Sequence, residues 1–172
     1  GDRDADGRFR PYDSLFTREP AKTRDTLLRS VIWYLEQFKQ DPAKTVILSN
    51  GTAAVELSFK INLDLDTPDA EPFILCGHLD RVVTLDEDYW VSDRKTSKNQ
   101  LSPRFWNQFT PNNQMSLYYA AGQIVLNKPI AGILIDAVEL GATYARFQRH
   151  AIHRTHGQQA EWLSDTYLWL NL

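Results

Sequence analysis

The feature that most constrains the fold is a strict alternation of apolar and polar residues from 55 to 63. A period of two is typical of a β-strand with one buried face, because successive side chains point to opposite sides of the strand. The pattern therefore predicts a half-buried strand. Its apolar positions are Val55, Leu57, Phe59, Ile61 and Leu63.

The rest of the chain supplies helices and further strands around this one. A helix is predicted from Thr23 until Asp41-Pro42, because its apolar residues recur at intervals of three and four. These residues are Leu27, Leu28, Val31, Ile32, Leu35 and Phe38. The other predicted elements are strands at 45–49, 73–85, 89–96, 130–140 and 143–152, helices at 114–126 and 160–170, and a short helix near Phe105 in a polar loop at 97–113.

The continuous apolar run at 130–140 indicates a central strand. The order of elements indicates an α/β fold with a mixed central sheet flanked by helices. At 172 residues the chain is expected to hold one domain, at 23–172, after an irregular polar lead-in at 1–22.

Composition excludes several classes of protein. The 19 Lys and Arg residues against 22 Asp and Glu residues exclude a polybasic, histone-like DNA binder. A single cysteine, Cys76, excludes a disulfide framework, a four-cysteine zinc site and an iron–sulfur cluster held within this chain. The apolar runs are far shorter than the roughly 18 residues of a membrane span, and no signal peptide is visible. We therefore expect an intracellular, cytoplasmic protein without a membrane partner, and its start at Gly1 suggests the C-terminal part of a longer chain.

Three charged residues on two predicted neighbouring strands carry the chemistry. Asp80 lies in the second half of one strand, and Asp93 and Lys95 lie two residues apart on the next. A hairpin of this length can bring the two aspartates side by side, and the period of two places Asp93 and Lys95 on one face. Two carboxylates suit Mg²⁺, which prefers oxygen ligands and retains water. A nearby ammonium can offset the charge that develops in phosphodiester hydrolysis.

These residues resemble the motifs of the PD-(D/E)xK nuclease superfamily, in its RecB-like and lambda-exonuclease-like branch. GHLDRV at 77–82 resembles the GxxDRV strand of that branch, and VSDRKTS at 91–97 resembles its (D/E)xK-T strand. QMSLYYAA at 114–121 resembles its Q-x-x-x-Y helix, and VELSFKINL at 55–63 resembles the strand before the first aspartate. The resemblance covers about residues 23–152 and implies a restriction-endonuclease-like αβββαβ core.

The resemblance also implies roles for individual residues. Asp80, Asp93 and the backbone carbonyl of Arg94 would bind Mg²⁺ or Mn²⁺, and Lys95 would activate the attacking water. Gln114 and Tyr118 would orient Lys95 or contact the substrate phosphate. Cleavage of DNA would leave a 5′-phosphate and a 3′-hydroxyl.

Further residues admit two interpretations. Glu56 could add a carboxylate to the metal site or be a solvated surface residue, and His78 could contact substrate or form a structural hydrogen bond. Lys98 and Arg104 lie among aromatic residues after the D-x-K strand, a combination that suits contact with bases and phosphates. Trp162 and Trp169 are expected to pack in the core.

The expected function is that of a metal-dependent DNA exonuclease in recombination, repair or phage DNA processing, with a helicase or recombination protein as a candidate partner and a phage gene as a candidate origin. Many members of the branch carry a histidine ligand before the first helix, but no histidine precedes His78 here. A non-catalytic, DNA-binding scaffold domain of a larger helicase–nuclease or phage assembly is therefore the alternative. A restriction or junction-resolving endonuclease is a third interpretation, and the oligomeric state stays open.

Overall fold

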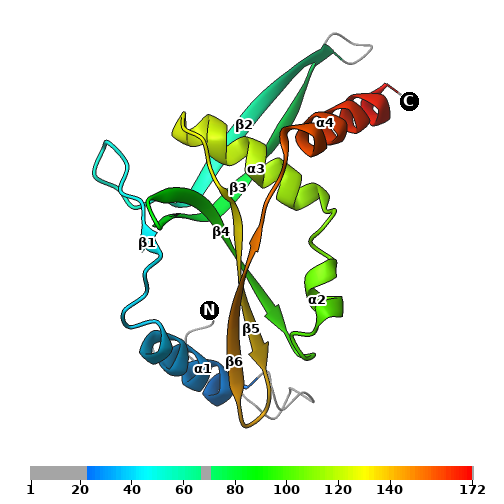
Figure 1. Cartoon of the computed structure of the whole chain (residues 1–172). Coiled ribbons are helices and arrows are strands. Elements are labelled where there is room, and N and C mark those ends of the chain that lie inside the picture. The colour runs from blue at the N-terminus through cyan, green and yellow to red at the C-terminus, as the bar shows by residue number, and fades with distance from the viewer. Residues whose placement is uncertain (1–22, 67–70, 172) are drawn as a thin grey trace, which may run out of the picture.

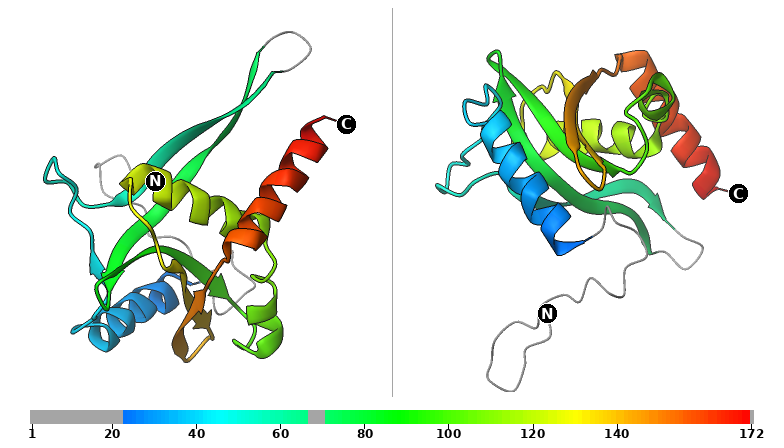
Figure 2. Two further views of the ribbon diagram at one scale, coloured as in Figure 1. Left: turned by 45° about the horizontal axis from the view of Figure 1, so that its top comes forward. Right: turned by 90° about the horizontal axis from the view of Figure 1, so that it is seen from below.

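One mixed β-sheet with helices on both of its faces organises the chain (Figures 1 and 2). The computed structural model describes residues 23–66 and 71–171. In chain order the elements are α1 (Arg24–Gln37), β1 (Lys44–Thr45), β2 (Val55–Asp66), β3 (Pro72–Leu85), β4 (Asp88–Ser97), α2 (Pro103–Asn107), α3 (Asn113–Leu126), β5 (Gly132–Leu140), β6 (Ala145–Ile152) and α4 (His156–Leu170). The predicted α/β class is confirmed. The predicted lead-in at 1–22 lies outside the described residues, and the domain limits at 23–172 stay a prediction.

The strands lie in the order β1, β3, β4, β5, β6, and β2 pairs with β3. The β4–β5 pair is parallel, whereas the pairs on either side of it, β3–β4 and β5–β6, are antiparallel. Every residue of β5 except Leu140 is buried, so the apolar run at 130–140 forms a central strand as predicted.

The long strand β3 changes partner along its length. Its C-terminal part pairs with β4 from Arg81↔Ser92 to Leu85↔Asp88, and its N-terminal part pairs with β2. Beyond Arg81↔Ser92, β3 continues with β2 toward the upper hairpin in Figure 1, while β4 turns away beside β5. The two strands therefore separate next to Asp80.

The main core lies between the sheet and α3. It includes Leu79, Val82 and Val91 from the strands that separate, and Met115 from α3. Gly122 lets α3 approach β4 closely, because a Cβ atom there would lie 2.6 Å from Cγ2 of Val91. This close approach packs the third turn of α3 against the N-terminal half of β4.

Helix α1 covers the opposite face of the sheet (Figure 2). It begins where predicted, with Thr23 as a cap that accepts a hydrogen bond from the Thr26 amide. The apolar stripe predicted from Leu27 to Leu35 is exposed, however, with Ile32 at 63%. The helix packs instead through Thr26, Ser30, Tyr34 and Phe38, because the sheet beneath it carries buried charges that need a polar partner.

Helix α4 closes the described fold beside α3. The Gln159 amide donates to the Ser116 carbonyl, and the Tyr167 hydroxyl donates to the Leu63 carbonyl. Trp162 is partly buried, whereas Trp169 is 76% exposed, so its predicted place in the core is wrong. The helix meets the rest of the molecule through its Gln159–Tyr167 side, and Trp169 follows the last of these contacts. Within 23–66 and 71–171, no helix is long and apolar enough to cross a membrane.

Candidate active site

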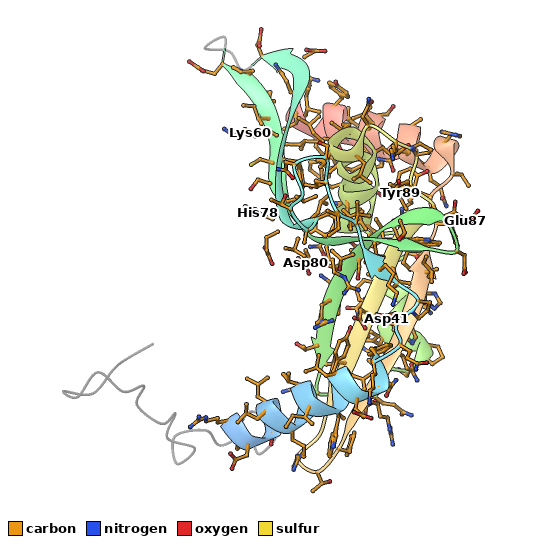
Figure 3. The ribbon with its side chains drawn as sticks, turned by 90° about the vertical axis from the view of Figure 1, so that its left-hand side faces the viewer. Asp41, Lys60, His78, Asp80, Glu87 and Tyr89 are labelled. Atoms are coloured by element: carbon orange, nitrogen blue, oxygen red, sulfur yellow. The ribbon has the colours of Figure 1, made fainter. Side chains whose placement is uncertain are left out.

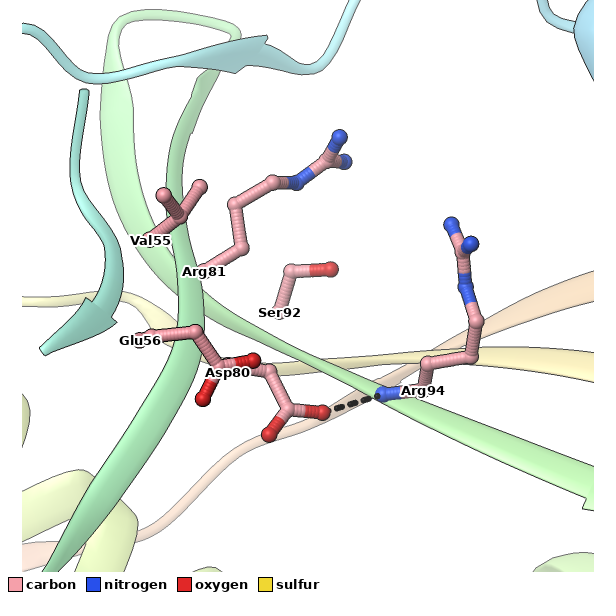
Figure 4. A pocket seen from close by; sticks show the side chains of 6 residues that line it. All are labelled: Val55, Glu56, Asp80, Arg81, Ser92 and Arg94. Carbon is pink, nitrogen blue, oxygen red and sulfur yellow. Dashed lines mark hydrogen bonds between the residues drawn. The ribbon is translucent and has the colours of Figure 1, made fainter. Parts of the chain in front are cut away.

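Asp80 lies where β3 leaves β4. The regular hydrogen-bond ladder between β3 and β4 ends at this point, and the Asp80 carboxylate takes the place of a backbone carbonyl as hydrogen-bond acceptor. Its Oδ2 accepts a hydrogen bond of 3.2 Å from the Arg94 amide (Figure 4). Asp93, the residue before that amide, would be the next partner of Asp80 in the β3–β4 register. The predicted juxtaposition of the two aspartates is thus found in the fold, and their roles stay a prediction.

Lys95 lies on the same strand face as Asp93, as the period of two predicts. Its Nζ is 2.8 Å from Oδ2 of Asp93 and donates a 2.9 Å hydrogen bond to Oε1 of Gln114. The ammonium is therefore held between a carboxylate and an amide from two different elements. A lysine ammonium has three N–H groups, so one remains for a third partner.

Gln114 and Tyr118 come from the first two turns of α3. The helix begins after Asn112, whose side chain accepts from the Met115 amide. Residues four apart share a helix face, and the Gln114 Nε2 donates to the Tyr118 hydroxyl at 3.1 Å. This bond fixes the amide so that its oxygen faces Lys95.

Burial sets the electrostatics of Asp93, which is only 2% exposed. Loss of solvent raises the pKa of its carboxyl above the ordinary value, Lys95 opposes the rise, and the charge of Asp80 adds to it. Burial likewise raises the pKa of the Tyr118 phenol; the bond from Gln114 lowers it, and the charges of Asp93, Asp80 and Glu56 raise it further. Two adjacent carboxylates in a partly desolvated site are stabilised by a cation between them.

Glu56 lies on the strand next to Asp80. It stands between the paired positions Val55↔Arg81 and Leu57↔Leu79, opposite Asp80. Both side chains line one cavity of about 360 Å³ (Figure 4). Glu56 has a φ of +50°, which costs a non-glycine residue about 1–2 kcal/mol. Asp64, Asp86, Glu87 and Asn127 also have positive φ, so this conformation does not single out Glu56, and its place in the site stays a prediction.

The donor set fits a hard cation that keeps its water. Among the described residues, no three His, Cys, Asp or Glu side chains are grouped so that they could hold a metal ion, so the candidate set consists of two carboxylates and a backbone carbonyl. Asp80, Asp93 and the carbonyl of Arg94 offer oxygen atoms only, and Asp93 is a buried carboxylate. Mg²⁺ is often bound through one or two carboxylates and several waters. These residues can therefore hold Mg²⁺ or Mn²⁺, and the set lacks the nitrogen and sulfur donors that zinc favours.

The three predicted substrate residues lie at different distances from this centre in the fold. His78 shares β3 with Asp80 (Figure 3), and its Nδ1 is 3.1 Å from the Ser58 hydroxyl, as expected for a structural histidine. Arg104, on α2, lines a separate cavity with Ser97 and Gln108. Lys98 follows β4 and is exposed. Neither Lys98 nor Arg104 lines the cavity of Asp80, and contact of all three residues with substrate stays a prediction.

A charged network behind the site was not predicted. The Arg94 side chain points to the α1 face, where its Nη2 donates to Oδ2 of Asp136 at 2.9 Å and its guanidinium lies 4.2 Å from the Tyr34 ring centroid. Asp136, 1% exposed, also accepts from the Tyr34 hydroxyl at 2.5 Å and lies 3.4 Å from Nε of Arg149. The lone aspartate in the apolar run at 130–140 was the signal for this network in the sequence.

Comparison with known proteins identifies the family. A model described as the PD-(D/E)XK nuclease superfamily matches residues 4–167. The chain belongs to this superfamily. A solved structure titled "Crystal structure of SSO0001" is similar with 9% identity and a TM-score of 0.42, over 83% of this chain and 57% of that one. No curated protein matched the chain.

Membership of the PD-(D/E)XK superfamily confirms the predicted restriction-endonuclease-like fold. The superfamily is one of nucleases. The chain spans 57% of the length of the solved relative.

Proposed function

We propose that this PD-(D/E)XK protein is a Mg²⁺- or Mn²⁺-dependent deoxyribonuclease, and specifically an exonuclease of the RecB-like and lambda-exonuclease-like branch. The observation that carries the proposal is the chain of contacts from Asp93 through Lys95 and Gln114 to Tyr118, beside Asp80. The five proposed catalytic residues of the motifs, Asp80, Asp93, Lys95, Gln114 and Tyr118, lie in or beside this chain of contacts.

Asp80, Asp93 and the Arg94 carbonyl would hold the cation, with Glu56 as a further oxygen donor. When bound, the cation supplies Lewis-acid stabilisation of a phosphoryl oxygen and acidifies water. The Arg94 amide keeps Asp80 oriented through the 3.2 Å hydrogen bond. Because this amide and the carbonyl belong to one residue, β4 positions both sides of the site.

Lys95 is the residue proposed to act on the substrate directly. Two of its contacts are taken by Asp93 and Gln114. The remaining N–H can donate to the attacking water or to a non-bridging phosphate oxygen, where negative charge increases during attack. Gln114 and Tyr118 act through Lys95 as positioning residues, because their bond fixes which atom of the amide faces the ammonium.

The exonuclease assignment rests on the Q-x-x-x-Y helix. Its two motif side chains contact each other, and one of them holds the motif lysine, which supports membership of that branch. A role in recombination, repair or phage DNA processing, a helicase or recombination partner, and a cytoplasmic location belong to the same proposal.

Degradation of linear and closed circular DNA tests the proposal. Duplexes labelled at their ends and closed circular duplexes are incubated with Mg²⁺, Mn²⁺ or EDTA. The proteins are the wild type, Lys95→Ala and the control Lys128→Gln, which removes a positive charge that donates to the Tyr89 hydroxyl; Tyr89 is labelled apart from Asp80 in Figure 3. We expect metal-dependent loss of linear DNA alone, reduced about 10²–10⁴-fold in Lys95→Ala and unchanged in Lys128→Gln.

Other outcomes would change the assignment. Cleavage of the circle would overturn the exonuclease and indicate an endonuclease of the restriction or junction-resolving type. DNA binding without cleavage in the presence of either metal would overturn the proposed nuclease activity and indicate a scaffold domain.

A further inference from the structure

The cavity beside Asp80 has an acidic wall and a basic wall. Glu56 and Asp80 carry its carboxylates, and Arg81 and Arg94 carry its guanidinium groups. In Figure 4 both guanidinium groups point away from the carboxylates of Glu56 and Asp80, and the Ser92 hydroxyl lies below the guanidinium group of Arg81. Asp80 and Arg81 are consecutive on β3, and consecutive residues of a strand face opposite sides. Their charges therefore lie on different walls of the cavity that opens where β3 and β4 separate. A ligand filling the cavity would meet both signs of charge.

Arg81 belongs to the basic wall, and its charge also acts on the carboxyl of Asp41. Its Nη2 is buried and has no hydrogen-bond partner among the described residues. A buried polar group left unpaired is costly, so such groups in folded proteins call for an explanation. A bound anion would satisfy this nitrogen.

Arg94 and Ser92 complete an anion-binding surface. The Nη2 of Arg94 donates to Asp136 and the guanidinium group lies over the Tyr34 ring, so its position is fixed. Among the described residues, its other guanidinium nitrogens have no assigned hydrogen-bond partner. Ser92 pairs directly with Arg81 across the two strands and adds a hydroxyl donor. Two guanidinium groups and a hydroxyl match the oxygens of a phosphate, which arginine binds in a bidentate manner.

We propose that Arg81, Ser92 and Arg94 form a phosphate subsite that binds a backbone phosphate of the DNA strand entering the cavity, next to the carboxylates of Asp80 and Glu56. This inference rests on the proposed function and names the contact that places the strand. The ligand is either an internal phosphodiester or the terminal phosphate of a DNA end, since both present the same oxygens to the arginines.

DNA binding in the presence of Ca²⁺, without turnover, tests the subsite. Fluorescence anisotropy at about 0.1 M salt compares wild type, Arg81→Gln, Arg81→Lys and Lys128→Gln. The three DNAs are a 5′-phosphorylated linear strand, the same strand with a 5′-hydroxyl, and a closed circular strand. Thermal unfolding of each variant checks that it is folded.

We expect Arg81→Gln to weaken binding about 10-fold and to reduce the slope of log affinity against log salt by about one. Arg81→Lys, which keeps the charge but loses the planar fork, should fall between wild type and Arg81→Gln, and it serves as the test if Arg81→Gln does not fold. Lys128→Gln should stay within twofold of wild type. An equal loss on all three DNAs identifies an internal phosphodiester, and a loss confined to the phosphorylated linear strand identifies a terminal phosphate.

Folded Arg81 variants that bind all three DNAs as Lys128→Gln does would overturn the subsite. This failure is distinct from failure of the proposed nuclease. If the wild type is inactive but still binds DNA through Arg81, the proposed nuclease activity is wrong and the phosphate subsite stands. If the wild type is active but its DNA binding does not change when Arg81 is substituted, only the phosphate subsite is wrong.

Discussion

At the scale of the residue, the site depends on how Lys95 is held. Asp93 provides the opposite charge, and Gln114 provides a neutral acceptor whose direction is set by Tyr118. The Tyr118 ring is buried, so its hydroxyl has little freedom to move away from Gln114. The contribution of each residue should therefore decrease with its distance along the chain of contacts from Lys95.

Substitutions along this chain should have graded effects on DNA cleavage. Lys95→Ala should cause the greatest loss, Gln114→Ala an intermediate loss of about 10–100-fold, and Tyr118→Phe a loss below about 10-fold, because the last change removes only the bond that orients the amide. Single-turnover cleavage rates under saturating Mg²⁺ measure the order. A Tyr118→Phe variant as slow as Lys95→Ala would contradict a positioning role for Tyr118.

Asp93 should make the stability of the metal-free protein depend on pH. Its pKa in the folded chain lies above the ordinary 3.8, so folding favours the protonated form. The stability it contributes is thus present below about pH 4 and is lost as the pH rises through the folded pKa. Urea unfolding of wild type and Asp93→Asn in EDTA, from pH 4 to 7, should show the wild type losing stability relative to the variant. A difference between the two that does not vary with pH would refute this account.

At the scale of the element, strand β4 connects the site to the opposite face of the sheet. Asp93 and Lys95 face α3, whereas the side chain of Arg94, between them, binds Asp136 and Tyr34 on the α1 side. The anchored side chain holds the Arg94 peptide groups that contact Asp80 and that would bind the cation. Asp136 in turn holds both Arg94 and Arg149.

Loss of the Asp136 charge should destabilise the fold much more than loss of an exposed carboxylate. Asp136→Asn removes the buried carboxylate that pairs with Arg94 and lies beside Arg149, although Arg149 keeps its ion pair with Asp41. We expect a cost of about 3 kcal/mol in the free energy of unfolding. The matched control is Glu36→Gln, which breaks the exposed pair with Lys39 and should cost at most about 0.5 kcal/mol. Chemical denaturation measures both. Equal effects would show that the buried network contributes no more than a surface pair.

At the scale of the whole molecule, the two faces of the sheet are covered by different kinds of contact. The α3 face packs through apolar side chains of the main core, whereas α1 lies over a charged face and leaves its own apolar stripe in solvent. Burial, rather than hydrophobic character, should therefore decide which aliphatic residues stabilise the fold.

Two isoleucines allow a direct comparison. Ile135 on β5 is fully buried, and Ile32 on α1 is 63% exposed. Ile135→Ala should cost about 2–5 kcal/mol, and Ile32→Ala should change stability by less than about 0.5 kcal/mol. Denaturant unfolding of both variants checks the orientation of α1. A large loss for Ile32→Ala would show that its side chain is buried in the folded chain.

These contrasts show what sequence could and could not predict. Periodicity indicated the strands around Val55 and Ile135, and motif spacing brought Asp80 and Asp93 together. The apolar stripe of α1 suggested a buried face that the structure does not have. A helical period shows which residues share a face, but it does not show what that face contacts. The pocket of Arg81 was missed because it depends on the residue at which β3 leaves β4, which local sequence does not encode.

The parallel pairing of β4 with β5 bears on the order of events during synthesis. The proposed metal-binding residues and their lysine lie between positions 56 and 95, and Gln114 and Tyr118 follow on α3, all ahead of β5. Antiparallel pairs such as β3–β4 close over short loops, whereas β4 meets β5 only after α2 and α3 have been made. A nascent chain therefore carries the full set of proposed site residues before it can hold them in place. We therefore expect cleavage competence to appear only after β5, with Asp136, has left the ribosome.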